Sequence, residues 1–492
     1  MNPLSLLNQL DTIIPTAITG TVQETAGTTV LVSGFPAPVG ALAEIRLRDR
    51  SVLPAEVIGF HDKTAVLYPL QSTHGIRHGD RVHLVQTAPW LTVGEGMLGK
   101  VLDARGRVME TSGSVSSSTY GSMYNSTYNS AYNSTYGTAS NSAYRTGSGN
   151  GNASTPVRKN GSVLREAPTN DAILNTERIP FHREAPKVFE RPRITTPIST
   201  GVRAIDAVLT LGEGQRVGIF AGSGVGKSTL LGMIARYSNA DVIVIGLVGE
   251  RGREVNDFLE RDLGPEGQKR SVVVVATSDE PAILRVRAAQ TVTAVAEYFR
   301  DQGKNVLLLM DSLTRFAMAQ REIGLAAGEP PTRNGYPPSV FAMLPALVER
   351  TGRTRTGNIT AMYTVLVEGD DENEPIADTV RGLLDGHIWL SRKLASAGHY
   401  PAIDIPSSIS RLMNDICERD HVQTAQELRA MISLWREFQD LIAINAYKRG
   451  TNPALDVALE KKKAITYFLR QNTDEPSTLE KAVTEMMEII RR

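Results

Sequence analysis

Residues 220–230, with the sequence FAGSGVGKSTL, constrain the fold of this chain more than any other segment. The apolar run 217–220 before the loop predicts a strand, and the residues from Lys227 onward predict a helix. Glycines in the loop allow a tight turn with inward-pointing N–H groups, and the positive end of a helix attracts anions. The segment therefore predicts a strand–loop–helix unit that cradles phosphate.

The residue types in this loop match a nucleotide site with a metal ion. Lys227 would reach the β- and γ-phosphates, and the Ser228 hydroxyl would bind Mg²⁺. The motif usually begins with Gly, where this chain has Ala221, a difference that matters only if the backbone there needs a positive φ. The alternative interpretation is a glycine-rich turn without a ligand. The residues expected to surround ATP are Gly222, Ser223, Gly224, Val225, Gly226, Lys227, Ser228 and Thr229.

Composition gives no support to a nucleic-acid-binding, membrane-bound or secreted protein. The chain has 53 Lys and Arg against 53 Asp and Glu, and this balance does not favour general binding to nucleic acid or anionic membranes. The one cysteine, Cys417, cannot form an intramolecular disulfide, which fits a reducing compartment. We find neither a signal-peptide pattern nor an apolar run of about 20 residues, so we expect a cytoplasmic protein.

The chain of 492 residues has room for about three domains. Short strand-like runs with turn residues between them predict a β-barrel at 18–90. Four leucines in the preceding segment 1–17 could form the face of a short helix, which would either pack on its own domain or dock a partner. Residues 95–110 read as a hairpin that leads into the next domain.

Residues 111–162 are rich in Ser, Thr, Asn and Gly, and tyrosines recur every four residues from Tyr120 to Tyr136. Such a composition cannot bury enough apolar surface to fold. We interpret the segment as a disordered surface insertion, with a partner-binding role as the alternative.

The remainder of 91–410 alternates apolar runs with helical stretches, which predicts a parallel sheet covered on both faces. Residues 411–492 read as helical, with an apolar stripe from Leu428 to Ile442 that is typical of a packed core. The predicted buried strands are 217–220, 242–247, 272–276, 306–310, 360–367 and 388–390.

Two of these strands end in acidic residues. Asp311 closes the run VLLLM, where a carboxylate would stand near Mg²⁺ or simply cap the next helix. Glu250 and Arg251 follow the run at 242–248, where the carboxylate could polarise a water and the arginine could contact the γ-phosphate. A helix start with a surface ion pair explains the residue types of Glu250 and Arg251 equally well.

Together with the phosphate loop, these residues and the decapeptide PAIDIPSSIS at 401–410 resemble the rotary ATPase α/β superfamily. The stretches RNGYPPSVF (333–341), VEGDDENEPIAD (367–378) and AYKRG (446–450) resemble the flagellar type III export ATPases within it. The resemblance covers nearly the whole chain except the Tyr-rich insertion. It implies an N-terminal β-barrel, a central RecA-like P-loop domain and a C-terminal helical domain.

The resemblance also assigns roles residue by residue. Lys227 and Ser228 match the phosphate lysine and the magnesium hydroxyl, and Asp311 matches the acid near Mg²⁺. Glu250 matches the water-activating glutamate, and Arg251 the neighbouring phosphate-sensing arginine. Tyr400 matches the aromatic that stacks on adenine, for which a core tyrosine is the alternative. Arg411 matches the arginine finger that acts on the neighbouring subunit.

The resemblance implies a homohexamer, because a finger acting in trans needs a ring. The implied partners are a stalk-like regulatory protein at the N-terminus, a coiled-coil central stalk, export-gate membrane proteins and export chaperone–substrate complexes. The implied place is the cytoplasmic face of the inner membrane. Three alternatives remain open: an injectisome ATPase, a Rho-type nucleic-acid motor, which the near-zero charge and few N-terminal aromatics disfavour, and a catalytically silent ring subunit.

Overall fold

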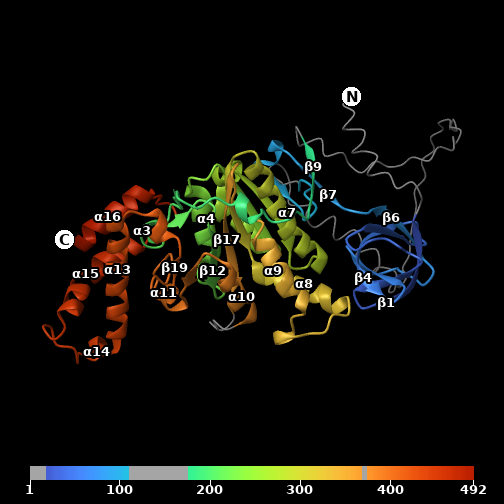
Figure 1. The fold of residues 1–492 in the computed structure, drawn as a ribbon. Coiled ribbons are helices and arrows are strands. Elements are labelled where there is room, and N and C mark those ends of the chain that lie inside the picture. Colours follow the sequence, from blue (N-terminus) through green and yellow to red (C-terminus); the bar gives the residue numbers. More distant parts are fainter. Residues whose placement is uncertain (1–17, 110–175, 368–373, 492) are drawn as a thin grey trace, which may run out of the picture. The chain divides into compact units, whose positions relative to one another are not determined.

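The computed structural model describes residues 18–109, 176–367 and 374–491 (Figure 1). The predicted N-terminal docking segment and the predicted insertion at 111–162 lie outside these ranges. Among the described helices, none has the length and apolarity that a membrane crossing requires.

The first described domain is a closed barrel, as the alternating short runs predict. Its strands follow the order β1-β2-β5-β4-β3-β6. In β4, buried side chains alternate with partly exposed ones from Leu53 to Val57, whereas β5 is buried along nearly its whole length. Gly20 permits close packing inside the barrel, since a Cβ there would lie 2.6 Å from Val32 and 2.8 Å from Phe35. The strands are β1 (Thr19–Ala26), β2 (Thr29–Ser33), β3 (Leu42–Arg46), β4 (Val52–His61), β5 (Thr64–Pro69) and β6 (Arg81–Gln86).

The second domain is built on a large, mostly parallel sheet, which confirms the predicted α/β class. The strand order is β19-β18-β12-β17-β15-β13-β14-β8, with β16 (Gly352–Arg353) paired to β17. The strands are β8 (Val101–Leu102), β12 (Arg216–Ala221), β13 (Val242–Glu250), β14 (Ser271–Thr277), β15 (Asn305–Asp311), β17 (Asn358–Leu366), β18 (Gly386–Leu390) and β19 (Ile409–Ser410).

Both faces of this sheet are covered, because successive side chains of its buried strands enter two different cores. In β13, Val242 and Val244 belong to one core, whereas Ile243 and Ile245 belong to the other. The first core contains α7 (Ala282–Asp301), α8 (Leu313–Ala326), α9 (Pro338–Val348) and α10 (Pro375–Leu383), which Figure 1 shows beside the sheet. The second contains α3 (Arg203–Val208), α4 (Lys227–Tyr237), α5 (Gly252–Asp257), the π-helix η3 (Phe258–Leu263) and the C-terminal helices.

The predicted hairpin at 95–110 is only partly present. Leu102 bridges Val108 across a turn, but β8 also pairs in parallel with β14 and so forms the edge of the large sheet. A strand of two residues carries too little pattern to be found in a sequence. Nearby short elements are η1 (Glu95–Met97), η2 (Val188–Glu190), and the strand pairs β7 (Trp90–Val93) with β9 (Glu177–Pro180) and β10 (Pro197–Ile198) with β11 (Leu211–Gly212).

The C-terminal region is helical, as predicted, but only the first part of its apolar stripe is buried. Leu428 and Ile432 are buried in the second core, whereas Leu441 is 45% exposed because α13 ends at Glu437 and the chain turns into α14. The helices are α12 (Met413–Ile416), α13 (Arg419–Glu437), α14 (Gln439–Ala443), α15 (Pro453–Leu469) and α16 (Leu479–Arg491). Other short helices are α6 (Gly264–Lys269), α11 (Arg392–Ser396) and η4 (Arg333–Gly335).

Candidate active site

The phosphate loop has the predicted strand–loop–helix geometry. It joins the carboxyl end of β12 to α4, which begins at Lys227. Gly224 and Gly226 have φ values of 76° and 89°, a region that L side chains rarely adopt. Ala221 remains in the strand, paired with Leu366, and has no positive φ, so the missing first glycine does not disturb the loop.

Three charged side chains meet above this loop. Lys227 Nζ lies 2.5 Å from Asp311 Oδ1 and 3.4 Å from Glu250 Oε1. The sheet explains the meeting, because β13 and β15 are parallel neighbours and their carboxyl ends carry Glu250 and Asp311 to one edge. The Thr364 hydroxyl, on β17, donates a 2.7 Å hydrogen bond to the same Asp311 oxygen.

Burial and mutual charge shift the protonation of this cluster. Burial, reinforced by the charge of Asp311, raises the pKa of Glu250 to about 7, despite the opposing effect of Lys227. Burial disfavours the charged ammonium of Lys227, but Asp311 and Glu250 outweigh this effect and raise its pKa. Lys227 thus stays charged for phosphate, and Glu250 has a pKa near neutrality, as a general base requires.

The loop and the charged cluster open into a cavity of about 910 Å³, which is at the upper end of the range for ligand sites. Glycines of the loop, Lys227, Ser228, Glu250 and Arg251 line it, whereas the predicted residues Asp311 and Tyr400 are not among its lining residues. Val225 does not line the cavity, because its side chain is buried in the second core.

Magnesium fits the donors present. Ser228, which carries a hydroxyl, lines the cavity, and the Asp311 carboxylate contacts Lys227 of the same loop; Mg²⁺ prefers such oxygen ligands together with water and substrate phosphates. Across the ranges 18–109, 176–367 and 374–491, no three His, Cys, Asp or Glu side chains gather to hold a metal. Mg²⁺ usually binds through one or two carboxylates together with substrate phosphates, so the ion would depend on the nucleotide for part of its coordination.

Sequence reasoning missed Arg315, which lies in the first turn of α8. Its side chain lines the cavity, and its Nε is buried without a hydrogen-bond partner in the structure. Gly249, with φ 73°, makes room for it, since a Cβ there would lie 2.9 Å from Arg315 Cβ. The available signal is its place in the first turn of the helix that follows the acid-tipped strand, close to the carboxyl edge of the sheet. Met318, Arg321 and Tyr336 also line the cavity.

Tyr400 lies beside the phosphate loop, although it comes from a distant part of the sequence. A Cβ on Gly226 would lie 3.3 Å from the Tyr400 ring, and the tyrosine is 46% exposed. The alternative of a core tyrosine is therefore wrong. A half-exposed ring next to a phosphate cradle is suited to stacking on a base.

We expect Tyr400→Ala to weaken ATP binding about tenfold or more, since stacking of a base on an aromatic contributes roughly 1–3 kcal/mol. Tyr400→Phe keeps the ring and is the matched control. Equilibrium binding of ATP to each variant measures the effect. Equal affinity for the Ala and Phe variants would exclude stacking by this residue.

Arg411 is not brought to this cavity. It directly follows β19, where Ser410 pairs with Gly386 at the start of β18, whereas the end of β18 lies beside Ala221. Four strand residues separate these points, or roughly 13 Å along the sheet. The exposed Arg411 thus lies at the amino edge of the sheet, and the phosphate loop lies at the carboxyl edge.

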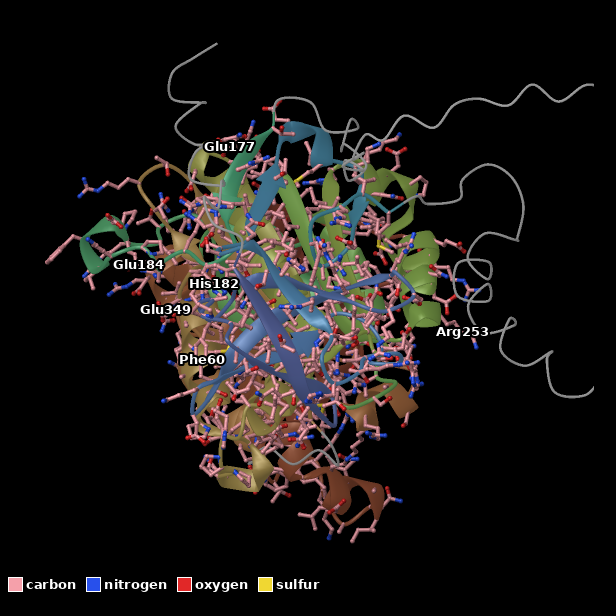
Figure 2. All side chains as sticks on the ribbon, turned by 90° about the vertical axis from the view of Figure 1, so that its right-hand side faces the viewer. Phe60, Glu177, His182, Glu184, Arg253 and Glu349 are labelled. Carbon is pink, nitrogen blue, oxygen red and sulfur yellow. The ribbon has the colours of Figure 1, made fainter. Side chains whose placement is uncertain are left out.

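The two edges face different sides of the molecule. Glu349, whose carboxylate lies 2.7 Å from Arg216 at the start of β12, marks the amino edge. Arg253, three residues after Glu250, marks the carboxyl edge. Figure 2 shows Glu349 and Glu184 on one side of the view and Arg253 on the opposite side.

Comparison with known proteins agrees with this architecture in all three regions. The nucleotide-binding domain of the ATP synthase alpha/beta family matches residues 201–410, and the beta-barrel domain of the same family matches 22–84. The C-terminal domain of the type III secretion (T3SS) EscN ATPase matches 417–488.

Relatives match over nearly the full length. The chain is 45% identical to a flagellum-specific ATP synthase of Bacillus subtilis, over 95% of this chain and 94% of the relative. It is 43% identical to a type 3 secretion system ATPase of Xanthomonas euvesicatoria, over 94% of this chain and 91% of the relative. The assembled ATPase EscN of enteropathogenic E. coli matches with a TM-score of 0.78 and 39% identity, over 96% of this chain and 100% of that structure. The chain therefore belongs to the ATP synthase alpha/beta family, together with the flagellum-specific ATP synthases and type III secretion ATPases.

Proposed function

We propose that this protein hydrolyses Mg-ATP to energise protein export by a flagellar type III secretion apparatus. Glu250 orients and polarises the attacking water, and Lys227, Arg251 and Arg315 face the phosphates. When bound, magnesium supplies positive charge to the phosphate oxygens next to Ser228 and Asp311. Tyr400 stacks on the adenine.

The observation that carries this proposal is the contact of Lys227 with both Asp311 and Glu250, in which Lys227 and Glu250 line the cavity and Asp311 is buried behind them. A phosphate-binding lysine, a metal-side acid and a base with a pKa near 7 are the parts that phosphoryl transfer to water needs. Their presence argues against a silent ring subunit. The named relatives give no support to the Rho-type alternative.

The separation of Arg411 from its own cavity supports a ring. If Arg411 completes a site, that site belongs to another copy. Contacts between opposite edges of a chain form a ring when the rotation between copies closes. We propose a homohexamer, as the assembled state of the relative EscN suggests.

Other partners follow from the relatives. EscN is also known in complex with its central stalk EscO, at a TM-score of 0.77 and 38% identity to this chain. We propose a coiled-coil central stalk for this protein as well. A stalk-like regulator at the N-terminus, export-gate membrane proteins and chaperone–substrate complexes complete the proposal, which places the ring at the cytoplasmic face of the membrane.

The test follows phosphate release from ATP by the purified protein as its concentration is raised, with Mg²⁺ and with EDTA. We expect specific activity to rise steeply with concentration and to vanish in EDTA. A flat profile would contradict the ring. Deleting the gene separates the flagellar assignment from the injectisome alternative, because only the flagellar assignment predicts loss of swimming.

A further inference from the structure

Val188 and Phe189 form an exposed apolar projection at η2, which we call the apolar knob. Their exposed fractions are 79% and 89%, and Phe189 is the most exposed large apolar side chain in the part of the chain that the structure describes. Single exposed apolar residues are common, but here two large ones are adjacent and together form a small exposed apolar patch.

The turn that carries the knob is held firmly. The Glu190 carboxylate accepts a 2.8 Å hydrogen bond from the Lys187 N–H. The Arg191 guanidinium donates to the carbonyls of Pro186 and Thr351, and Arg355 donates to the Phe189 carbonyl at 3.3 Å. These bonds fix the backbone while both apolar side chains face solvent. A knob held in place in advance loses little entropy when it binds.

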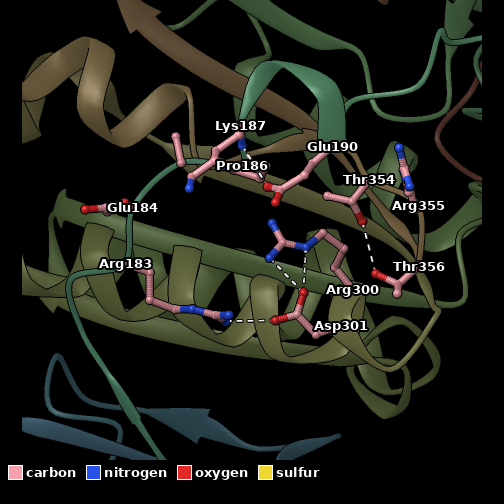
Figure 3. Close-up of a pocket in the computed structure, with 11 residues that line it drawn as sticks. Arg183, Glu184, Pro186, Lys187, Glu190, Arg300, Asp301, Thr354, Arg355 and Thr356 are labelled. Atoms are coloured by element: carbon pink, nitrogen blue, oxygen red, sulfur yellow. Dashed lines mark hydrogen bonds and ion pairs between the residues drawn. The ribbon is translucent and has the colours of Figure 1, made fainter.

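Charged residues surround the knob. Lys187 and Glu190, on either side of it in sequence, line a pocket of about 360 Å³, together with Arg183, Glu184 and Arg355 (Figure 3). Arg300 and Arg183, on the floor of this pocket, are both paired with Asp301. An apolar centre with a rim of both charges has the anatomy of a protein–protein interface rather than of an anion site.

Three ion pairs and one backbone hydrogen bond connect Arg191, next to the knob, to Arg411 along the amino edge of the sheet. Arg191, next to η2, lies 3.3 Å from Glu349 Oε2, and Glu349 Oε1 lies 2.7 Å from Arg216. Arg216 Nε lies 3.1 Å from Asp385 Oδ2, and the Asp385 carbonyl accepts a 3.0 Å hydrogen bond from the Arg411 N–H. The knob and Arg411 thus lie along the same edge of the sheet.

We propose that the apolar knob packs against the neighbouring copy of this chain, as part of the surface that delivers Arg411. The inference rests on the proposed ring, and it goes further by naming the apolar anchor of the contact. The occupant is a second copy because the amino edge with Arg411 must face the carboxyl edge of a neighbour if Arg411 completes that neighbour's site. Buried aromatic anchors carry much of the energy of such contacts.

Phe189→Ser tests the proposal, with Ile444→Ser as the matched control. Ile444 is 72% exposed, next to α14, on a different element from the knob. Sedimentation velocity and specific activity are measured against protein concentration for both variants and the wild type. We expect the assembly midpoint of Phe189→Ser to move about tenfold or more to higher concentration, since burying a phenylalanine contributes roughly 1.5–3 kcal/mol. Ile444→Ser should follow the wild type.

The possible failures are distinguishable. If the wild type shows neither assembly nor concentration-dependent activity, the proposed ring fails and the knob contact fails with it. If the wild type assembles and both variants share its midpoint, the ring stands and the knob contact is overturned. Because Phe189 is almost fully exposed, circular dichroism should show an unchanged fold.

A photo-reactive benzoylphenylalanine at position 189 provides an independent measurement. Irradiation above the assembly midpoint should yield a product with the mass of two copies, and its cross-linked peptide should come from the carboxyl edge that carries Lys227 and Glu250. Irradiation below the midpoint should yield the single chain. Absence of the two-copy product in assembled samples would overturn the proposal.

Discussion

A Glu250→Gln variant is expected to bind ATP as the wild type does and to hydrolyse it roughly 10²- to 10⁴-fold more slowly, the usual contribution of a general base. Gln keeps the size of the side chain and can still accept a hydrogen bond from Lys227, so the cavity should keep its shape. It cannot take up a proton from water. The loss should therefore appear in turnover, whereas affinity should be almost unchanged.

Phosphate release and equilibrium ATP binding measure this effect. Glu260→Gln is the control, because Glu260 is an exposed glutamate on η3 that does not line the cavity. That control should retain most of the activity. Turnover of Glu250→Gln near the wild-type rate would show that another group activates the water.

An Arg411→Ala variant is expected to lose roughly 10³- to 10⁵-fold in turnover at concentrations where the wild type is assembled, as loss of an arginine finger does. The guanidinium would stabilise charge that develops on the phosphates of the neighbouring site. Arg419→Ala, which removes another exposed arginine at the start of α13, is the control and should remain active.

Mixing the two inactive variants tests the trans arrangement directly. In a mixed ring, an Arg411→Ala copy contributes an intact Glu250, and a Glu250→Gln copy beside it contributes an intact Arg411. Such interfaces should hydrolyse ATP, so the mixture should be far more active than either variant alone. A mixture as inactive as its components would mean that both residues serve the same copy.

The parts of the site that could be predicted are those in which one local segment defines a position. The loop 220–230 contains its own turn and helix start, and Glu250 and Asp311 each end a strand whose apolar pattern is clear. The structure brings these residues together as expected. Arg251 lines the same cavity, but its role in catalysis, like that of Arg411, stays a prediction.

The parts that could not be predicted depend on which strands become neighbours. Thr364 reaches Asp311 only because β17 lies between β12 and β15, although it is last of the three in sequence. Arg315 can occupy its position because Gly249, which it packs against, has no Cβ. The knob at Val188 and Phe189 lies in a short turn without periodicity, and only its exposure distinguishes it from a buried turn.

Glu250 and Arg411 lie at opposite edges of the sheet, and this has a consequence for cells that carry both a wild-type and a defective gene. A copy without Glu250 silences its own site, and a copy without Arg411 silences one next to it, but a copy without both silences two. If equal amounts of wild-type and defective chains mix at random in rings, either single defect leaves about half of the sites intact, and the double defect leaves about a quarter. The doubly substituted variant should therefore inhibit the wild-type protein more strongly than either single variant, even though all three variants are inactive on their own.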